Sequence, residues 1–239
     1  MKGMLKVLKK AVMIMAVCAV MVAFFAPADA NAASKRVKNI KELVSQMDGF
    51  EYKVLSDIQF DINVGEVRKI NLNAANKVYA ASTAYSTKIL KCTTVENEEE
   101  YWESYEEDVI STKSMKQSQL DMFGKKYGVK YLDELPSENI ISGNVYKRDG
   151  RPVIRYAIYI DFEYLLAERK TTVDGNKVYK DIYYGYWGCD DDKSSNYRIT
   201  YTVKKNSVSK YGYVITGMKV EKTADEWTFT PQDPFVEFE

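Results

Sequence analysis

Two carboxylates have a spacing that a glycoside hydrolase could use. Asp161 and Glu163 are two residues apart in a segment whose side chains alternate between apolar and polar. In a strand, both would project from the same face of the sheet. Glycosidases use two carboxyl groups about 5–10 Å apart, which same-face neighbours can approach. Acidic residues opposite an apolar face are also what a solvated sheet displays, so a hydrolase is only the alternative.

The chain contains no histidine. Ser-His-Asp and Cys-His nucleophiles both need an imidazole as their base, and the commonest catalytic zinc sites use several imidazole ligands. These mechanisms are therefore excluded, whereas carboxylate or thiol chemistry is not. We expect a non-enzymatic protein without a cofactor. The alternative is a carboxylate-based glycoside hydrolase acting on wall or dietary polysaccharide.

Three consecutive aspartates could form a calcium loop. Asp190, Asp191 and Asp192 follow Cys189 and precede a Lys-Ser-Ser-Asn segment. Carboxylate, hydroxyl and amide oxygens are the ligands that Ca²⁺ prefers. However, the aspartates lack the alternate-residue spacing of the EF-hand loop, and consecutive side chains in an extended loop point in different directions. We favour a solvated turn over a metal site.

Tyrosine is abundant, with 19 residues of this type in the chain. Tyr159, Tyr179 and Tyr183 are predicted on the strand faces opposite the apolar side chains. Exposed aromatic rings there could stack against sugar or peptide. Because tyrosine suits any strand with a wet face, the favoured interpretation is an ordinary solvated sheet.

A dense acidic run lies in the middle of the sequence. It could dock a basic partner or a cell-wall polymer, but such a face more often keeps a helix soluble. Its members are Glu96, Glu98, Glu99, Glu100, Glu103, Glu106, Glu107 and Asp108.

The first 32 residues have the pattern of a secretory signal peptide. Four lysines precede an apolar run from Ala11 to Pro27, which is short for a membrane span. The small residues that follow predict cleavage after Ala30 or Ala32. Cys18 is not preceded by the small residue that a lipoprotein needs, and nothing later in the chain is apolar enough to span a bilayer. We expect a secreted, extracellular protein.

Charge and cysteine content bound the remaining possibilities. The chain has 34 basic and 34 acidic residues, and cleavage would remove four lysines and one aspartate. The mature protein would then be mildly acidic, without the basic stripe that nucleic-acid binding needs. Cys92 and Cys189 survive cleavage and could form a disulfide; two free thiols are the alternative.

Hydrophobic periodicity first predicts helices and one hairpin. A helix is predicted over 34–49 with Gly49 as a left-handed C-cap, and an amphipathic hairpin over 58–72. Two more helices are predicted over 97–110 and 113–123, the second ending at Gly124, with a further turn at 131–135.

From residue 144 onward, strands alternate with turns. The apolar residues keep a period of two over 154–166, 178–186, 197–203 and 214–220. Turns are predicted at Asp149-Gly150 and Asp174-Gly175, and bends or bulges at Gly212 and Gly217. Since alternating strands must bury one face, this predicts an α+β fold: N-terminal helices packed on a curved antiparallel β-sheet of about four to six strands. Segments 33–94 and 95–239 would form one continuous domain.

The order of elements resembles the cystatin-like or NTF2-like arrangement, in which early helices pack into a bent sheet. The chain also resembles small secreted proteins of Gram-positive anaerobes in which a helix ends in Phe-Gly-Lys-Lys ahead of tyrosine-rich strands. The residues concerned are Phe123 to Lys126, Tyr186-Trp187-Gly188, Tyr197 and Tyr213. The predicted hairpin ahead of the helices departs from the simplest version, and this arrangement hosts both enzymes and binding modules, so it transfers no active site.

A binding or structural protein outside the cell fits these observations best. Its expected partner is a protein, peptide or glycan. A stabilising module of an envelope or secretion complex would have the same sequence features.

Overall fold

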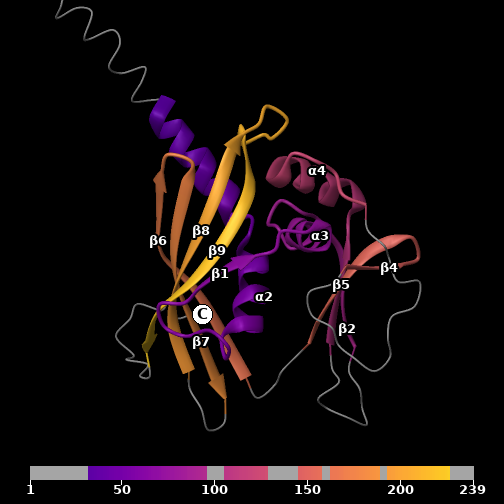
Figure 1. Cartoon of the computed structure of the whole chain (residues 1–239). Helices are drawn as coiled ribbons and strands as arrows, with labels where there is room; N and C mark the ends of the chain where they lie inside the picture. Colours follow the sequence, from indigo (N-terminus) through magenta and orange to yellow (C-terminus); the bar gives the residue numbers. More distant parts are fainter. Residues whose placement is uncertain (1–31, 96–104, 129–144, 158–161, 189–192, 227–239) are drawn as a thin grey trace, which may run out of the picture. The chain divides into compact units, whose positions relative to one another are not determined.

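The computed structural model describes residues 32–95, 105–128, 145–157, 162–188 and 193–226 (Figure 1). The chain divides into two units, 1–39 and 40–239. Residues 32–39, the described part of the first unit, are helical. The second unit contains the remaining helices and both β-sheets. In the parts of the chain that the structure describes, no helix is long and apolar enough to cross a membrane.

Three labelled helices follow a helical stretch that ends at residue 45, and the second and third of them begin at a capping side chain. Asn73 caps the second of them by accepting a hydrogen bond from the Asn76 backbone N–H, and Ser111 caps the third in the same way through Ser114. Gly124 ends the third with φ of 71°, in the left-handed region that favours glycine. The helices are α2 (Asp48–Ile58), α3 (Ala74–Ser82) and α4 (Thr112–Phe123).

Nine strands form two antiparallel sheets. The five-stranded sheet has the order β1-β9-β8-β7-β6, and the four-stranded sheet has the order β2-β3-β5-β4. The strands are β1 (Val67–Ile70), β2 (Ile89–Val95), β3 (Tyr105–Ile110), β4 (Val145–Arg148), β5 (Arg151–Ala157), β6 (Phe162–Asp174), β7 (Lys177–Gly188), β8 (Lys193–Lys205) and β9 (Tyr213–Glu226).

The helices share one hydrophobic core with the sheets. Helix α4 contacts β9 and α3, and α3 also contacts α2 and β4. The inward residues of β8 are buried at alternate positions, from Tyr197 and Ile199 to Tyr201 and Val203. This confirms the α+β fold with helices on an antiparallel sheet, because the alternation that predicted it defines the buried face.

Gly49 allows the beginning of α2 to lie against the end of α3. A Cβ atom at this position would lie 2.6 Å from the Thr83 Cβ, so a larger residue would push the two segments apart. Gly49 was predicted as a left-handed C-cap, which is wrong. It lies inside α2, where its function is close approach.

The predicted turn at Asp149-Gly150, the bend at Gly212 and the bulge at Gly217 are confirmed, whereas the second turn consists of Gly175 and Asn176, one residue later than predicted. Asp149 and Gly150 connect β4 to β5 with φ of 49° and 75°, as a two-residue hairpin turn requires. In β9, Thr202 of β8 pairs with Gly217 while Val203 pairs with Ile215. The extra residue, Thr216, is left exposed on the bulge although its sequence position falls on the apolar face.

The hairpin predicted over 58–72 is wrong. Ile58 is the last residue of α2, because Val54, Leu55 and Ile58 repeat with helical rather than strand spacing on its buried side. Only Val67–Ile70 forms a strand in this segment, and it pairs with β9 at the edge of the five-stranded sheet.

The helix predicted over 97–110 is also wrong where the structure describes it. Tyr105–Ile110 is strand β3, which lies between β2 and β5 and pairs with both. The carboxylates of Glu106, Glu107 and Asp108 therefore belong to a strand. The rest of that predicted helix, residues 97–104, lies outside the described residues, as do Glu96 just before it and the predicted turn at 131–135.

The alternation over 154–166 does not belong to one strand. Residues up to Ala157 are in β5 of the four-stranded sheet, and β6 of the five-stranded sheet begins at Phe162. A period of two in the sequence continues because both segments are strands. It carries no sign that the chain passes from one sheet to another, so two sheets stand where one was predicted.

Candidate functional site

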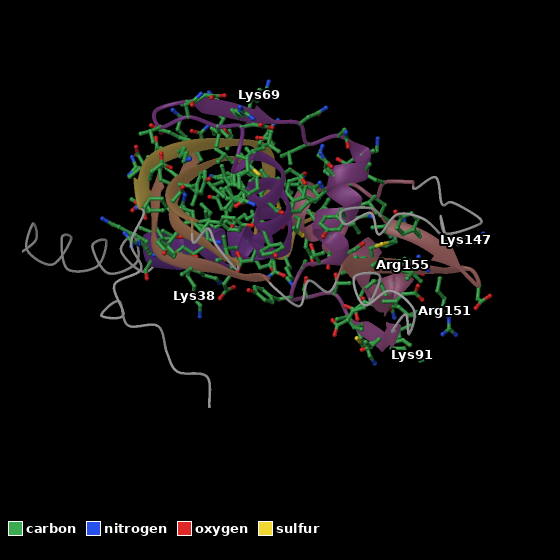
Figure 2. All side chains as sticks on the ribbon, turned by 90° about the horizontal axis from the view of Figure 1, so that it is seen from below. Lys38, Lys69, Lys91, Lys147, Arg151 and Arg155 are labelled. Carbon is green, nitrogen blue, oxygen red and sulfur yellow. The ribbon has the colours of Figure 1, made fainter. Side chains whose placement is uncertain are left out.

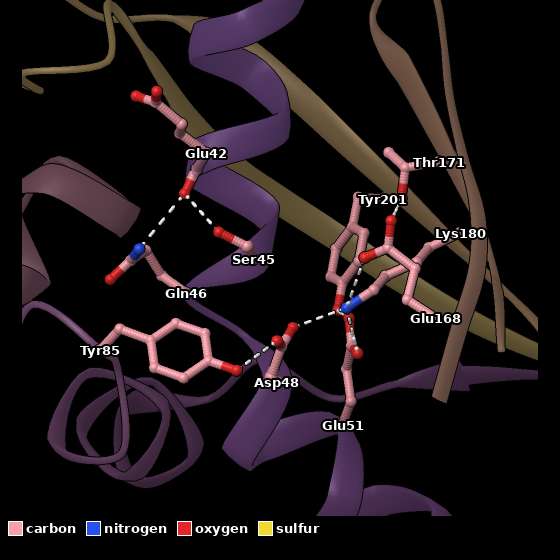
Figure 3. A network of polar contacts seen from close by, with 10 residues as sticks. All are labelled: Glu42, Ser45, Gln46, Asp48, Glu51, Tyr85, Glu168, Thr171, Lys180 and Tyr201. Atoms are coloured by element: carbon pink, nitrogen blue, oxygen red, sulfur yellow. Dashed lines mark hydrogen bonds and ion pairs between the residues drawn. The ribbon is translucent and has the colours of Figure 1, made fainter. Parts of the chain in front are cut away.

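Charged side chains from α2 and the five-stranded sheet converge inside the second unit (Figure 3). Asp48 and Glu51 lie in the first turn of α2, three residues apart, so their carboxylates share one face and also favour the positive helix N-terminus. Lys180 of β7 is in phase with Val178 and Ile182, which are buried. The pleat therefore directs its ammonium group into the interior.

Lys180 binds two carboxylates directly and lies near a third. Its Nζ donates to Asp48 Oδ1 at 2.6 Å and to Glu51 Oε2 at 2.7 Å. Glu168 Oε2 of β6 is 3.5 Å away. The Lys180 side chain is only 2 % exposed, so this cation is stabilised by its partners rather than by water.

Glu51 is the most deeply buried member of the cluster. Its side chain is 0 % exposed, and Tyr201 Oη of β8 donates to its Oε1 at 2.5 Å. Burial raises the pKa of the Glu51 carboxyl to about 7, although Lys180 opposes the shift. Burial and the neighbouring carboxylate also raise the pKa of Tyr201, whereas the two carboxylates raise the pKa of Lys180 against the effect of its own burial.

Asp48 extends the network to the surface. Its Oδ2 accepts a hydrogen bond of 2.7 Å from Tyr85 Oη, and Tyr85 is 73 % exposed. Thr171 Oγ1 donates to Glu168 Oε1 at 2.7 Å. We call Asp48, Glu51, Lys180 and Tyr201 the buried cluster. Its groups can exchange protons with one another, and they join α2 to the middle of the sheet.

A second polar region is open to solvent on the four-stranded sheet. A hollow of about 510 Å³ is lined by side chains of β2, β3 and β5 and by the β4–β5 turn. The register explains the lining, since Lys91 is opposite Val109, which is in turn opposite Val153. We call this hollow the sheet groove. Its lining is Lys91, Thr93, Glu107, Val109, Asp149, Arg151 and Val153.

The sheet groove has an apolar floor and two exposed cations. Val153 is fully buried beneath it, while Lys91 and Arg151 are exposed. Glu107 is already paired, because Arg155 Nε donates to its Oε2 at 3.1 Å and both side chains are largely buried. Figure 2 shows Lys91, Arg151, Arg155 and Lys147 gathered on this sheet. Among the described residues that line the groove, Asp149 is the carboxylate besides the paired Glu107.

The predicted aromatic face is only partly described. Tyr179 is half-buried on β7, and Tyr183 is 3 % exposed with the Arg169 guanidinium 5.4 Å from its ring centre. Tyr159 lies outside the described residues. The structure therefore places Tyr183 in a buried position, whereas an open stacking surface needs it exposed.

The other predicted sites are mostly outside the described ranges. Cys92 is an exposed free thiol on β2, and its hydrogen bond to Asp108 raises its pKa. Its expected partner Cys189 lies outside the described residues, as do the calcium candidates Asp190, Asp191 and Asp192. In the carboxylate pair, Asp161 lies outside too, and of Glu163 the structure gives only the backbone in β6. No group of three or more potential metal ligands occurs within the part of the chain that the structure describes.

Sequence reasoning missed both polar regions. For the buried cluster there was a signal, since Lys180 interrupts an apolar alternation on β7 and Glu51 falls between Phe50 and Val54 on the buried side of a helix. For the sheet groove there was little, because its residues come from strands that were predicted as a helix or as part of a single sheet.

Comparisons with protein-family models, with characterised proteins and with solved structures gave no match. The resemblance to the cystatin-like or NTF2-like arrangement therefore stays a prediction.

Proposed function

We propose that this is a non-enzymatic extracellular protein that binds an extended acidic segment of another protein in the sheet groove. The observation that carries the proposal is the pairing of two exposed cations, Lys91 and Arg151, with an apolar floor of Val109 and Val153. Carboxylates of a partner would replace water on the cations, and its apolar side chains would cover the valines.

The geometry of the sheet supports a peptide over a sugar. The described residues that line the groove include no aromatic ring, whereas sugar recognition relies on such rings. Strand β2 is at one end of the order β2-β3-β5-β4 and forms one wall. An edge strand can add an extended peptide by main-chain hydrogen bonds, with side chains entering the adjacent groove.

The sequence supports the location. A lysine-rich start, an apolar run and two Ala-x-Ala motifs are typical of exported chains. N-terminal sequencing of the released protein should give Asn31 or Ala33 as the first residue. A chain retained in the cell with Met1 intact would contradict the extracellular part of the proposal.

Binding can be measured by fluorescence anisotropy with labelled ten-residue peptides that alternate Glu with Val, and with matched Gln-Val and Lys-Val peptides. The Glu-Val peptide should bind best, and rising salt should weaken it because the contacting charges are partly solvated. The double substitution Lys91→Glu with Arg151→Glu should lower affinity about tenfold or more, as expected for loss of two charge pairs and their reversal.

The matched control is Lys69→Glu with Lys219→Glu. These two exposed lysines are opposite each other on β1 and β9, in the five-stranded sheet rather than the sheet of the groove. Their substitution changes the net charge by the same amount as the groove variant. Equal losses in both double variants would mean that binding follows net charge alone. That result, or turnover of a polysaccharide by the purified protein, would overturn the proposal.

A further inference from the structure

The buried cluster places an amine and a carboxylate in position for a covalent bond. Lys180 Nζ lies 2.6 Å from Asp48 Oδ1, and Glu51 Oε2 lies 2.7 Å from the same Nζ. The amine, the acceptor and a second carboxyl group thus meet in one site. Asp48 and Lys180 belong to different elements, α2 and β7, that are far apart in the sequence.

We propose that Lys180 and Asp48 condense to an amide that cross-links α2 to β7, with Glu51 as the catalytic proton carrier. Glu51 qualifies for this role because it touches the reacting nitrogen and has no access to water. Proximity of this kind replaces a bimolecular encounter and lowers the entropic barrier.

The condensation is balanced without any added reactant. The Nζ–Cγ bond forms and one Cγ–O bond of Asp48 breaks. The ammonium group carries three protons: one stays on the amide nitrogen, and two leave with the oxygen as water. No electron is gained or lost, and the two opposite charges of the ion pair disappear together.

Glu51 would move those two protons one at a time. Its carboxylate first accepts a proton from Nζ, which frees the lone pair that attacks Cγ, and passes this proton to one oxygen of Asp48. It then accepts a second proton from the nitrogen, now bonded to Cγ, and delivers it to the same oxygen, which leaves as water. Burial favours the neutral form of Glu51, as its raised pKa of about 7 indicates, so the carboxyl group can hold the proton between the steps.

Two further features favour the reaction. Tyr85 Oη donates to Asp48 Oδ2 at 2.7 Å, which polarises the carbonyl and would stabilise the oxyanion that develops there. Enclosure of the Lys180 ammonium group, whose side chain is 2 % exposed, also favours the product, because this buried charge is replaced by a neutral amide. Tyr201 holds Glu51 in place through its other oxygen.

The test is the intact mass of the full secreted protein, purified in the folded state, with its N-terminus determined. We expect a mass lower than that of its residues by one water molecule. Proteolysis with tandem mass spectrometry should then find a branched peptide that joins the α2 segment to the β7 segment through Asp48 and Lys180.

Three variants separate the roles. Lys180→Arg and Glu51→Gln should both restore the full mass of the residues. Asp48→Asn should still cross-link, but with loss of ammonia in place of water, because an amide can accept the same attack. Lys177→Arg, on the same strand but exposed, is the matched control and should keep the loss of water.

The wild-type mass alone decides the central point, whether or not a variant folds. A folded protein whose mass equals that of its residues would overturn the proposal. A branch from Lys180 to Glu51 would overturn the assignment of Asp48 as acceptor and Glu51 as catalyst. Neither result depends on peptide binding in the sheet groove.

Discussion

The buried cluster and the sheet groove are built from the same residue types, lysine or arginine beside aspartate or glutamate, yet water reaches them differently. In the buried cluster, Lys180 and Glu51 are almost completely enclosed. In the sheet groove, Lys91 and Arg151 are exposed. Because a charge without water depends wholly on its partners, the first arrangement fixes the fold. Exposed charges contribute little to stability and are free to recognise a partner.

Removal of Lys180 should give the largest effect. Lys180→Ala removes the polar partner of fully buried Glu51 and the link from β7 to partly exposed Asp48, which should cost about 3–5 kcal/mol of unfolding free energy. Lys91→Ala is the matched change in the groove and should stay within about 0.5 kcal/mol. Urea unfolding of both variants measures the difference. Equal, small losses would remove the distinction between the two regions.

The second-largest effect is expected in the dependence of the unfolding free energy on pH. The folded pKa of Glu51 is raised from 4.5 to about 7, so the folded state binds more protons than the unfolded state between these values. Stability should therefore fall as pH rises through this window, with a limiting slope of about 1.4 kcal/mol per pH unit. In a cross-linked protein, Lys180 would carry no charge and would no longer lower the pKa of Glu51. Burial would still raise that pKa, so stability would still fall as pH rises.

Denaturant unfolding at several pH values between 4.5 and 8 measures this slope. The Glu51→Gln variant should lack that part of the dependence, since glutamine does not titrate. A wild-type curve that rises with pH in the same window and matches the variant would contradict the raised pKa.

Removal of either tyrosine hydroxyl at the two ends of the network should cost less unfolding free energy than removal of Lys180, and the two losses should differ from each other. Tyr201→Phe removes the donor to fully buried Glu51 and should cost about 1–3 kcal/mol, because the freed oxygen has no water to turn to. Tyr85→Phe removes the donor to Asp48 at an exposed ring, where water can substitute, and should cost less than about 1 kcal/mol. A larger loss of unfolding free energy for Tyr85→Phe than for Tyr201→Phe would contradict the inference that Glu51 is shielded from water and Asp48 is not.

The smallest effect on stability is expected in the groove itself. Lys91→Glu with Arg151→Glu should change the unfolding free energy by no more than about 0.5 kcal/mol, although it lowers peptide affinity. Thermal unfolding of the variant checks this. Marked destabilisation would mean that these side chains support the sheet, and the loss of affinity could no longer be assigned to direct contact.

The elements that were predicted correctly are those whose signals are local. Strands β7, β8 and β9 follow from alternation of apolar and polar residues, which a bulge interrupts in β9, and α4 follows from its periodicity together with Gly124, which has a left-handed conformation. The Asp149-Gly150 turn is specified by two adjacent residues with positive φ. In each case, the residues that carry the signal also form the element.

The errors arose where the structure depends on distant segments. Tyr105–Ile110 has enough aromatic and acidic residues at helical spacing to resemble a helix, but pairing on both sides with β2 and β5 makes it a central strand. The passage from β5 to β6 leaves no local mark, so two sheets could not be told from one. The Lys180 and Glu51 contact spans distant elements and was out of reach for the same reason, although each residue stood out within its own apolar pattern.

The most direct test of the dry character of the buried cluster is an NMR titration of the Glu51 side-chain carboxyl carbon. The account predicts a midpoint near pH 7, because burial disfavours the ionised form. A midpoint at the ordinary value near 4.5 would show that water solvates Glu51, and the division between a buried and an exposed charge cluster would then fail.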